Sequence, residues 1–224
     1  MLAFGYSFSW GWVPDSLGLF GSAALITLEI LLLSATFSLL IGLVLGQLLM
    51  SKRWYVRVPV RVWVELFRLT PILLQIVLIF FLLPIFTGAT LPAFTAGVIA
   101  LSLNYGAFFS EVFRAGVLSL GKGQREAAAA IGMTSFQALF HVIYPQAIRR
   151  MLPPITNMLV NLTKDTSLLT IIGVAELFNV AQGVAANTFR TIEVLIYLAG
   201  YYLVVNIPLS ILSNRLYARQ AVRI

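Results

Sequence analysis

The sequence contains no cysteine and a single histidine, His141. The lack of cysteine excludes disulfide bonds, a thiolate nucleophile and a cysteine-ligated metal, and one histidine cannot form a metal site alone. The sequence also lacks the phosphate-binding pattern Gly-x-x-x-x-Gly-Lys-Ser/Thr, the metalloprotease pattern His-Glu-x-x-His and the hydrolase pattern Gly-x-Ser-x-Gly. We therefore expect a chain that is not an enzyme and that binds no metal or cofactor itself.

Charge is scarce and apolar residues are abundant. Charged residues make up 10% of the chain and hydrophobic residues 60%, whereas soluble domains have about 25% and about 45–50%. The mean hydropathy is +0.95. In lipid every peptide group needs an internal partner, and the apolar runs are too long for barrel strands and do not alternate. The composition predicts an all-α membrane protein. No repeat or linker divides the chain, so residues 1–224 should form one transmembrane domain.

About five apolar segments are long enough to cross a bilayer, which takes about 20 helical residues. An interfacial start at Leu17 precedes the first span. The predicted spans run from about Gly21 to Met50, Val62 to Phe86, Leu91 to Val117, Leu152 to Thr170 and Ile192 to Leu212. Pro71 is expected to bend the second span, and Pro153 and Pro154 should occupy the first turn of the fourth.

Basic residues cluster between these spans and explain the net charge of +7. The clusters lie in residues 51–61, in residues 114–150 and after residue 212. Because loops rich in Lys and Arg stay on the cytoplasmic side, we expect the N-terminus outside and the C-terminus inside. This pattern also favours membrane lipid over nucleic acid as the reason for the basic charge.

The cytoplasmic segment 118–150 is predicted to dock on another protein. Gln124 to Ile131 favours a short helix with Glu126 in its first turn, and Gly132 suits a left-handed C-terminal cap. Ser135 can cap a second helix that runs toward Tyr144. The alanines of the first helix would let a partner approach closely. An ordinary helical hairpin on the membrane surface remains the alternative at this point.

The spacing within this segment resembles a known motif. Glu-Ala-Ala at 126–128 is followed after three residues by Gly132 and after nine more by Val-Ile-Tyr-Pro at 142–145. This resembles the EAA loop of ATP-binding-cassette importer permeases, which ends in Ile, any residue, Leu and Pro. Val142 and Tyr144 depart from that ending but keep apolar bulk.

Other segments resemble the polar amino acid branch of these permeases. They are Arg-Leu-Thr-Pro at 68–71, with Leu69 departing from a glycine, Leu-Ser-Leu-Asn-Tyr-Gly-Ala at 101–107 and Lys-Asp-Thr-Ser-Leu at 164–168. The resemblance covers nearly the whole chain after about Gly21.

The resemblance implies a type I importer permease fold in the bacterial inner membrane. The implied partners are an ATPase subunit that binds ATP and Mg, a second permease, identical or homologous, and an extracytoplasmic solute-binding protein. The implied ATPase-coupling residues are Glu126, Ala127, Ala128 and Gly132. The alternative function is an ion-coupled secondary transporter, which would use Lys164, Asp165 and Glu29.

Polar residues inside the predicted spans are candidates for a substrate path, since ionisable groups at membrane depth are costly. Those of the fourth span occupy an arc of about 100°, and two amides with a cation and an anion could bind a zwitterion. The alternative is a structural ion pair together with asparagine ties between helices. At Met158, relatives that handle cationic amino acids often carry Glu, which argues against such substrates. The candidates are Asn157, Met158, Asn161, Lys164, Asp165, Asn104 and Gln75.

Two further pairs of opposite charge lie one helical turn apart near cytoplasmic span ends. They are Glu65 with Arg68 and Glu111 with Arg114. We expect both to form local ion pairs.

Overall fold

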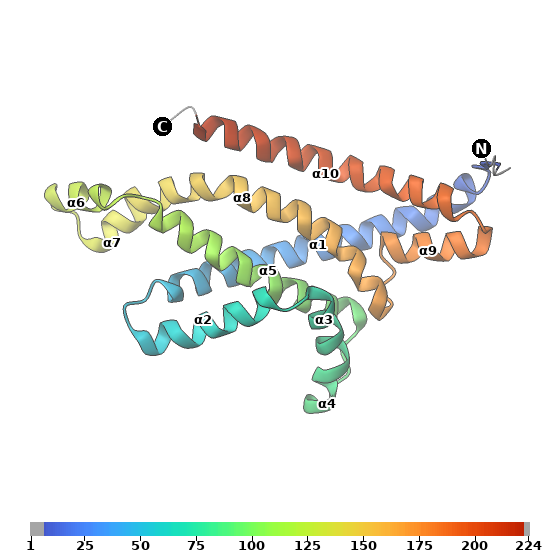
Figure 1. Ribbon diagram of the computed structural model, residues 1–224, viewed down its shortest axis with the longest axis horizontal. Helices are drawn as coiled ribbons and strands as arrows, with labels where there is room; N and C mark the ends of the chain where they lie inside the picture. Colours follow the sequence, from blue (N-terminus) through green and yellow to red (C-terminus); the bar gives the residue numbers. More distant parts are fainter. Residues whose placement is uncertain (1–6, 222–224) are drawn as a thin grey trace, which may run out of the picture.

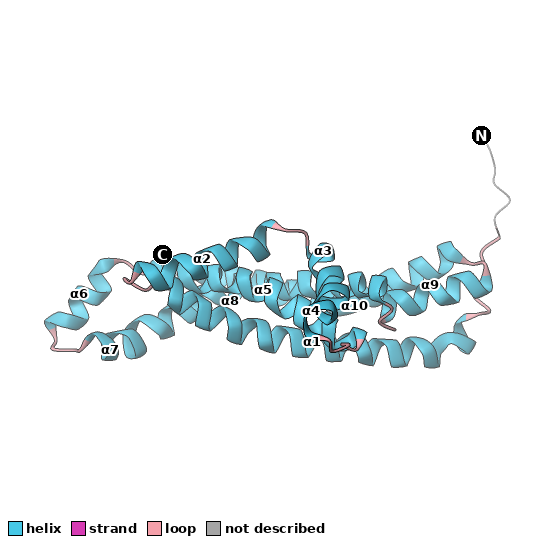
Figure 2. Cartoon of the chain, turned by 90° about the horizontal axis from the view of Figure 1, so that it is seen from below, coloured by secondary structure: helices cyan, strands magenta, loops and turns pink. Residues whose placement is uncertain are grey.

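The computed structural model describes residues 7–221, and these fold into helices joined by short connections (Figures 1 and 2). Among them α1 (Val13–Leu49), α5 (Ala93–Leu118) and α10 (Thr191–Ala221) are each long and apolar enough to cross a membrane. Two further helix pairs pass the same test together but are sharply bent. Counting each bent pair as one span gives up to five spans in the described part of the chain. The predicted all-α architecture and span number are therefore confirmed.

The helices α1 and α5 form the centre of the bundle, and small residues let them approach closely. A Cβ at Gly42 would lie 2.5 Å from the Cβ of Phe109, and one at Gly106 would lie 2.6 Å from Cγ2 of Ile41. Both distances are below any real contact, so glycine is required at both positions. The helix that contains the first predicted span is continuous from Val13, ahead of the expected interfacial start at Leu17, and Phe20 is buried within the bundle.

The second predicted span is broken, not merely bent. It consists of α2 (Trp54–Leu69), α3 (Ile72–Val77), the π-helix η1 (Leu78–Leu82) and α4 (Leu83–Thr87), with an angle of 106° between α2 and the rest. The break occurs because the residue before Pro71 is driven out of the helical region, and Thr70 is extended, with ψ 145°. The helix α2 begins at Trp54, inside the basic segment 51–61, and so extends beyond the expected start of the span at Val62.

The segment after α5 forms the two predicted short helices around Gly132, and we call residues 122–143 the knob. The knob contains α6 (Lys122–Ala130), α7 (Ser135–Gln137) and the π-helix η2 (Ala138–Ile143). Gly132 has φ 80°, which confirms the left-handed cap. The predicted second cap was one residue off. Thr134, not Ser135, accepts from the N–H of Gln137, whose side chain accepts in return from the N–H of Thr134.

The chain continues without a break from η2 into α8 (Tyr144–Asp165). The predicted start of a span near Leu152 is therefore wrong, and Pro153 and Pro154 lie inside α8. Pro145 is the proline that occupies the first turn. The side chains of Thr156 and Ser213 both donate to the carbonyl oxygen of Pro153, and the second of these bonds ties α8 to α10.

After α8 come the 3-10 helix η3 (Thr166–Ile172) and α9 (Leu177–Thr188), which is bent by 56° from the preceding helix. The side chain of Glu176 caps α9 by accepting from the N–H groups of Phe178 and Asn179. Figure 1 shows α9 and the start of α1 at one end of the bundle. The α1–α2 connection, α6, α7 and the last turns of α10 lie at the opposite end.

Candidate functional site

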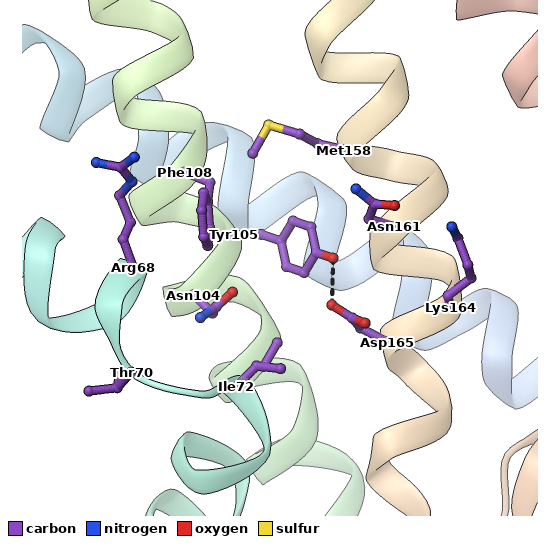
Figure 3. A pocket seen from close by; sticks show the side chains of 10 residues that line it. All are labelled: Arg68, Thr70, Ile72, Asn104, Tyr105, Phe108, Met158, Asn161, Lys164 and Asp165. Carbon is purple, nitrogen blue, oxygen red and sulfur yellow. Dashed lines mark hydrogen bonds between the residues drawn. The ribbon is translucent and has the colours of Figure 1, made fainter.

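A pocket of about 360 Å³ lies in the middle of the bundle, between the α2–α3 corner, α5 and α8 (Figure 3). The corner contributes because the break at Pro71 turns the chain across the end of α2. Discontinuous helices of this kind commonly surround the solute sites of transporters. The residues that line the pocket are Arg68, Thr70, Ile72, Asn104, Tyr105, Phe108, Met158, Asn161, Lys164 and Asp165.

One wall of the pocket is a polar face of α8. Met158, Asn161, Lys164 and Asp165 follow one another at helical spacing toward the end of that helix (Figure 3). The carboxylate of Asp165 accepts a hydrogen bond of 2.7 Å from the hydroxyl group of Tyr105 on α5. A hydrogen bond between α5 and α8 thus joins two residues that line the pocket.

The opposite wall comes from the end of α2. Arg68 pairs with Glu65, with 3.5 Å between Nη1 and Oε1, and its guanidinium carbon lies 5.5 Å from the ring centre of Phe108. The predicted ion pair is confirmed, as is the pair of Arg114 with Glu111. That Arg68 also lines the pocket was not predicted.

Gln75 lies behind the pocket and holds the α2–α3 corner. Its amide nitrogen donates to the carbonyl oxygens of Phe67 at 2.9 Å and Thr70 at 3.1 Å, which the helix break leaves without helical partners. Its amide oxygen accepts at 3.0 Å from Asn104 of α5. The side chain of Asn104 thus both lines the pocket and ties α5 to this corner.

The pocket brings together five of the seven predicted path residues, which are Asn104, Met158, Asn161, Lys164 and Asp165. Asn157 and Gln75 are not among its lining residues: Asn157 is exposed on α8, and Gln75 is 6% exposed within the corner. Sequence reasoning missed Tyr105 and Phe108, because the contact of α5 with α8 joins segments about 60 residues apart. The available signal was that Phe108 lies one helical turn after Asn104.

The knob presents part of the predicted coupling motif at its surface. Glu126 and Ala127 are exposed on α6, whereas Ala128 is 3% exposed and faces the inside of the knob. After Gly132 the chain closes on the helix, with the N–H of Met133 donating to the carbonyl oxygen of Ala128 at 3.0 Å. This bond has the spacing of a Schellman cap.

A row of aromatic rings connects the knob with the bundle. Ring centres are 4.4 Å apart for Phe136 and Phe140, 5.0 Å for Phe140 and Tyr144, and 5.9 Å for Tyr144 and Phe113 of α5. Phe136 is exposed at the outer end of the row, and Phe113 is buried at the inner end. The helices α7, η2 and α8 follow one another without a gap, so one helical segment, 135–165, extends from the knob to the pocket.

Comparison with known proteins identifies the family. The model of the family described as "Binding-protein-dependent transport system inner membrane component" matches residues 38–222. The chain belongs to this family. It is an all-helical permease subunit of an ATP-binding-cassette importer and a multi-pass protein of the inner membrane.

The permease is similar to two curated amino acid permeases. It is 37% identical over 216 residues to the glutamine transport system permease protein GlnP of Escherichia coli (strain K12), covering 96% of this chain and 99% of the relative. It is 42% identical over 189 residues to the L-cystine transport system permease protein TcyB of Bacillus subtilis (strain 168), covering 84% and 80%. Both relatives thus align over most of their length.

Solved structures share the same fold. The permease chain in the crystal structure of an amino acid ABC transporter with histidines superposes with a TM-score of 0.88 and 34% identity, covering 96% of this chain and 100% of that one. The MetNI methionine ABC transporter, in an inward-facing conformation, gives a TM-score of 0.73 at 20% identity, over 90% and 98%. The second match supports the fold alone. Family membership leaves no support for the alternative of an ion-coupled secondary transporter.

Proposed function

We propose that this permease translocates a polar amino acid across the inner membrane through the central pocket, driven by an ATPase subunit that docks on the knob. The observation that carries the proposal is the continuous helical segment 135–165, which bears the knob at one end and the charged pocket wall at the other. A shift of the knob would move that wall directly.

The chemistry of the pocket suits a zwitterion. Asp165 offers a carboxylate to an ammonium group, and Arg68 and Lys164 offer cations to a carboxylate on either side. Asn104 and Asn161 add amides for a polar side chain. The relatives named for glutamine and L-cystine carry solutes of this class.

The partners follow from the same proposal. The ATPase subunit binds ATP and Mg and contacts Glu126, Ala127 and the turn at Gly132, while Ala128 shapes the knob from within. A second permease, identical or homologous, completes the path, and an extracytoplasmic binding protein delivers the solute. In this arrangement the knob end of the bundle is cytoplasmic, and the end with α9 and the start of α1 is outside.

The experiment compares two glycine substitutions in the reconstituted transporter. Proline cannot adopt the φ of 80° at Gly132, so Gly132→Pro should abolish ATP-driven uptake while ATP hydrolysis continues. Gly121→Ala is the matched control, because Gly121 has φ −57° and nothing lies within 4 Å of an added Cβ. It should leave uptake within about twofold of the parent. Normal ATP-driven uptake by Gly132→Pro would contradict docking at the knob.

A further inference from the structure

Four ionisable residues of α2 lie on one side of the helix. They are Arg57, Arg61, Glu65 and Arg68, here called the charged stripe. At about 100° per residue they occupy an arc of about 80°. Glu65 stands between two cations, 4.0 Å from Arg61 and 3.5 Å from Arg68. The stripe extends from the knob end of the bundle to the pocket, which its last member lines (Figures 1 and 3).

Three different faces of α2 can be distinguished. Val60, Val64 and Phe67 pack into the bundle, and Val64 is fully buried. The face made of Val58, Val62 and Leu66 is exposed and purely apolar. The charged stripe lies between these two faces, next to the packing face. The apolar face is therefore the one suited to lipid.

The charges themselves indicate water beside the stripe. Ionisable side chains at membrane depth face a bundle interior or a water-filled cavity, since lipid cannot solvate them. Glu65 cannot be explained as an anchor to lipid phosphate, because it is an anion. Its side chain and that of Arg68 are each about one third exposed, at 34% and 32%. Arg68 lines the pocket, and its ion-pair partner Glu65 is exposed to the same degree.

We propose that the charged stripe forms one wall of a water-filled cytoplasmic path to the pocket. Its net positive charge makes the permease select amino acids with neutral or acidic side chains against dibasic ones. The inference rests on the proposed function, since it assigns the exit and the substrate class of the same pocket. Three cations and one anion on the stripe repel a second positive charge on the solute. Within the pocket, Lys164 adds a further cation beside Asp165.

The absence of cysteine makes the water path directly measurable, because a single introduced thiol is the only one in the chain. The permease copurified with its ATPase in nanodiscs is treated with anionic sulfonatoethyl and cationic trimethylammonioethyl methanethiosulfonates. Two pairs of neighbours compare the stripe with the lipid face at equal depth. They are Arg61→Cys with Val62→Cys and Glu65→Cys with Leu66→Cys.

In each pair the stripe thiol should react at least tenfold faster than its neighbour. Relative to a free thiol, the anionic reagent should be favoured about fivefold over the cationic one. Adding Arg57→Gln to Arg61→Cys should lower this preference several-fold. Lys52→Gln, the same loss of charge in the exposed connection before α2, should change it by less than about twofold.

Equal reaction on both faces, or a preference for the cationic reagent, would overturn the proposal. So would reaction at Arg61→Cys without reaction at Glu65→Cys, because that result would place the stripe among lipid headgroups.

Selectivity for the solute is tested with Thr70→Cys, because Thr70 lines the pocket. Glutamine and glutamate should slow its modification at least fivefold, and arginine at the same concentration should not. Protection by arginine equal to that by glutamate would refute the substrate class.

The two proposals can fail separately. If ATP-driven amino acid uptake proceeds while the stripe thiols stay unreactive, the path along α2 is wrong and the transport function stands. If the stripe thiols react as expected while no amino acid protects Thr70→Cys or is taken up, the proposed function is wrong.

Discussion

The hydroxyl group of Tyr105 on α5 and the carboxylate of Asp165 at the end of α8 are joined by a hydrogen bond of 2.7 Å. The bond connects the helix at the centre of the bundle with the helix that begins at the knob. Both residues line the pocket. A solute ammonium group that binds Asp165 would therefore meet a carboxylate whose direction α5 already sets.

Tyr105→Phe should separate this orienting role from packing. The ring is 5% exposed beside Phe108 and Phe109, so phenylalanine keeps its contacts. The loss of one hydrogen bond to a carboxylate should cost about 1–3 kcal/mol of solute binding, or roughly a tenfold rise in the KM of uptake. Uptake kinetics in proteoliposomes measure this, with ATPase binding as the control. An unchanged KM would remove Asp165 from the substrate path.

Gly42→Ala should destabilise the bundle by about 2–3 kcal/mol, because the added Cβ would meet the Cβ and backbone of Phe109 at 2.5 and 3.0 Å. The backbone of α5 cannot move aside as a flexible side chain could. Gly21→Ala in the same helix is the control, since nothing lies within 4 Å of its added Cβ. Thermal unfolding in detergent compares the two variants. Equal melting temperatures would contradict the close approach of α1 and α5.

Gln75→Leu should act on stability, because Gln75 holds the corner and does not line the pocket. Its removal takes a donor from the carbonyl oxygen of Thr70 and an acceptor from Asn104, which becomes the remaining side-chain donor to Phe67, at a cost of about 2–4 kcal/mol of unfolding free energy. Asn161→Leu, in the pocket wall, should instead weaken uptake with little change in melting temperature. Thermal unfolding and uptake of both variants test this division. The reverse pattern would place Gln75, not Asn161, on the substrate path.

Thr134→Ala should weaken the knob, since it removes the capping interaction with Gln137. A lost cap of this kind costs about 1 kcal/mol, and we expect uptake per ATP hydrolysed to fall. Ser135→Ala, one residue further, is the matched control and should leave this ratio unchanged. Simultaneous measurement of uptake and phosphate release gives the ratio. A larger loss in Ser135→Ala would show that the assigned cap is wrong.

Hydropathy and the spacing of charged residues and of glycine were sufficient to predict much of the fold. The span from Ala93 to Leu118, the short helix before Gly132 and the local pairs of Glu65 with Arg68 and Glu111 with Arg114 were all predicted. These features depend on the nature of the residue and on neighbours within about one helical turn.

Two of the errors concern prolines, which can either break a helix or lie within it. Pro71 breaks its span by 106°, whereas Pro153 and Pro154 lie within a continuous helix. A proline removes the same N–H in each case, so the proline alone does not decide whether the helix breaks. At the break, Gln75 supplies donors. Such partners are chosen by packing and are not visible in the local sequence.

The sequence by itself determined that the chain lies in a membrane, that it has about five spans and where the two short helices around Gly132 lie, because composition and helical periodicity act locally. The tertiary structure alone decided which polar residues share a pocket. Arg68 and Tyr105 joined it, and Asn157 and Gln75 did not. The physical reason is that the pocket forms where three segments distant in sequence cross, and the crossing depends on glycine contacts and a helix break that only the folded bundle places together.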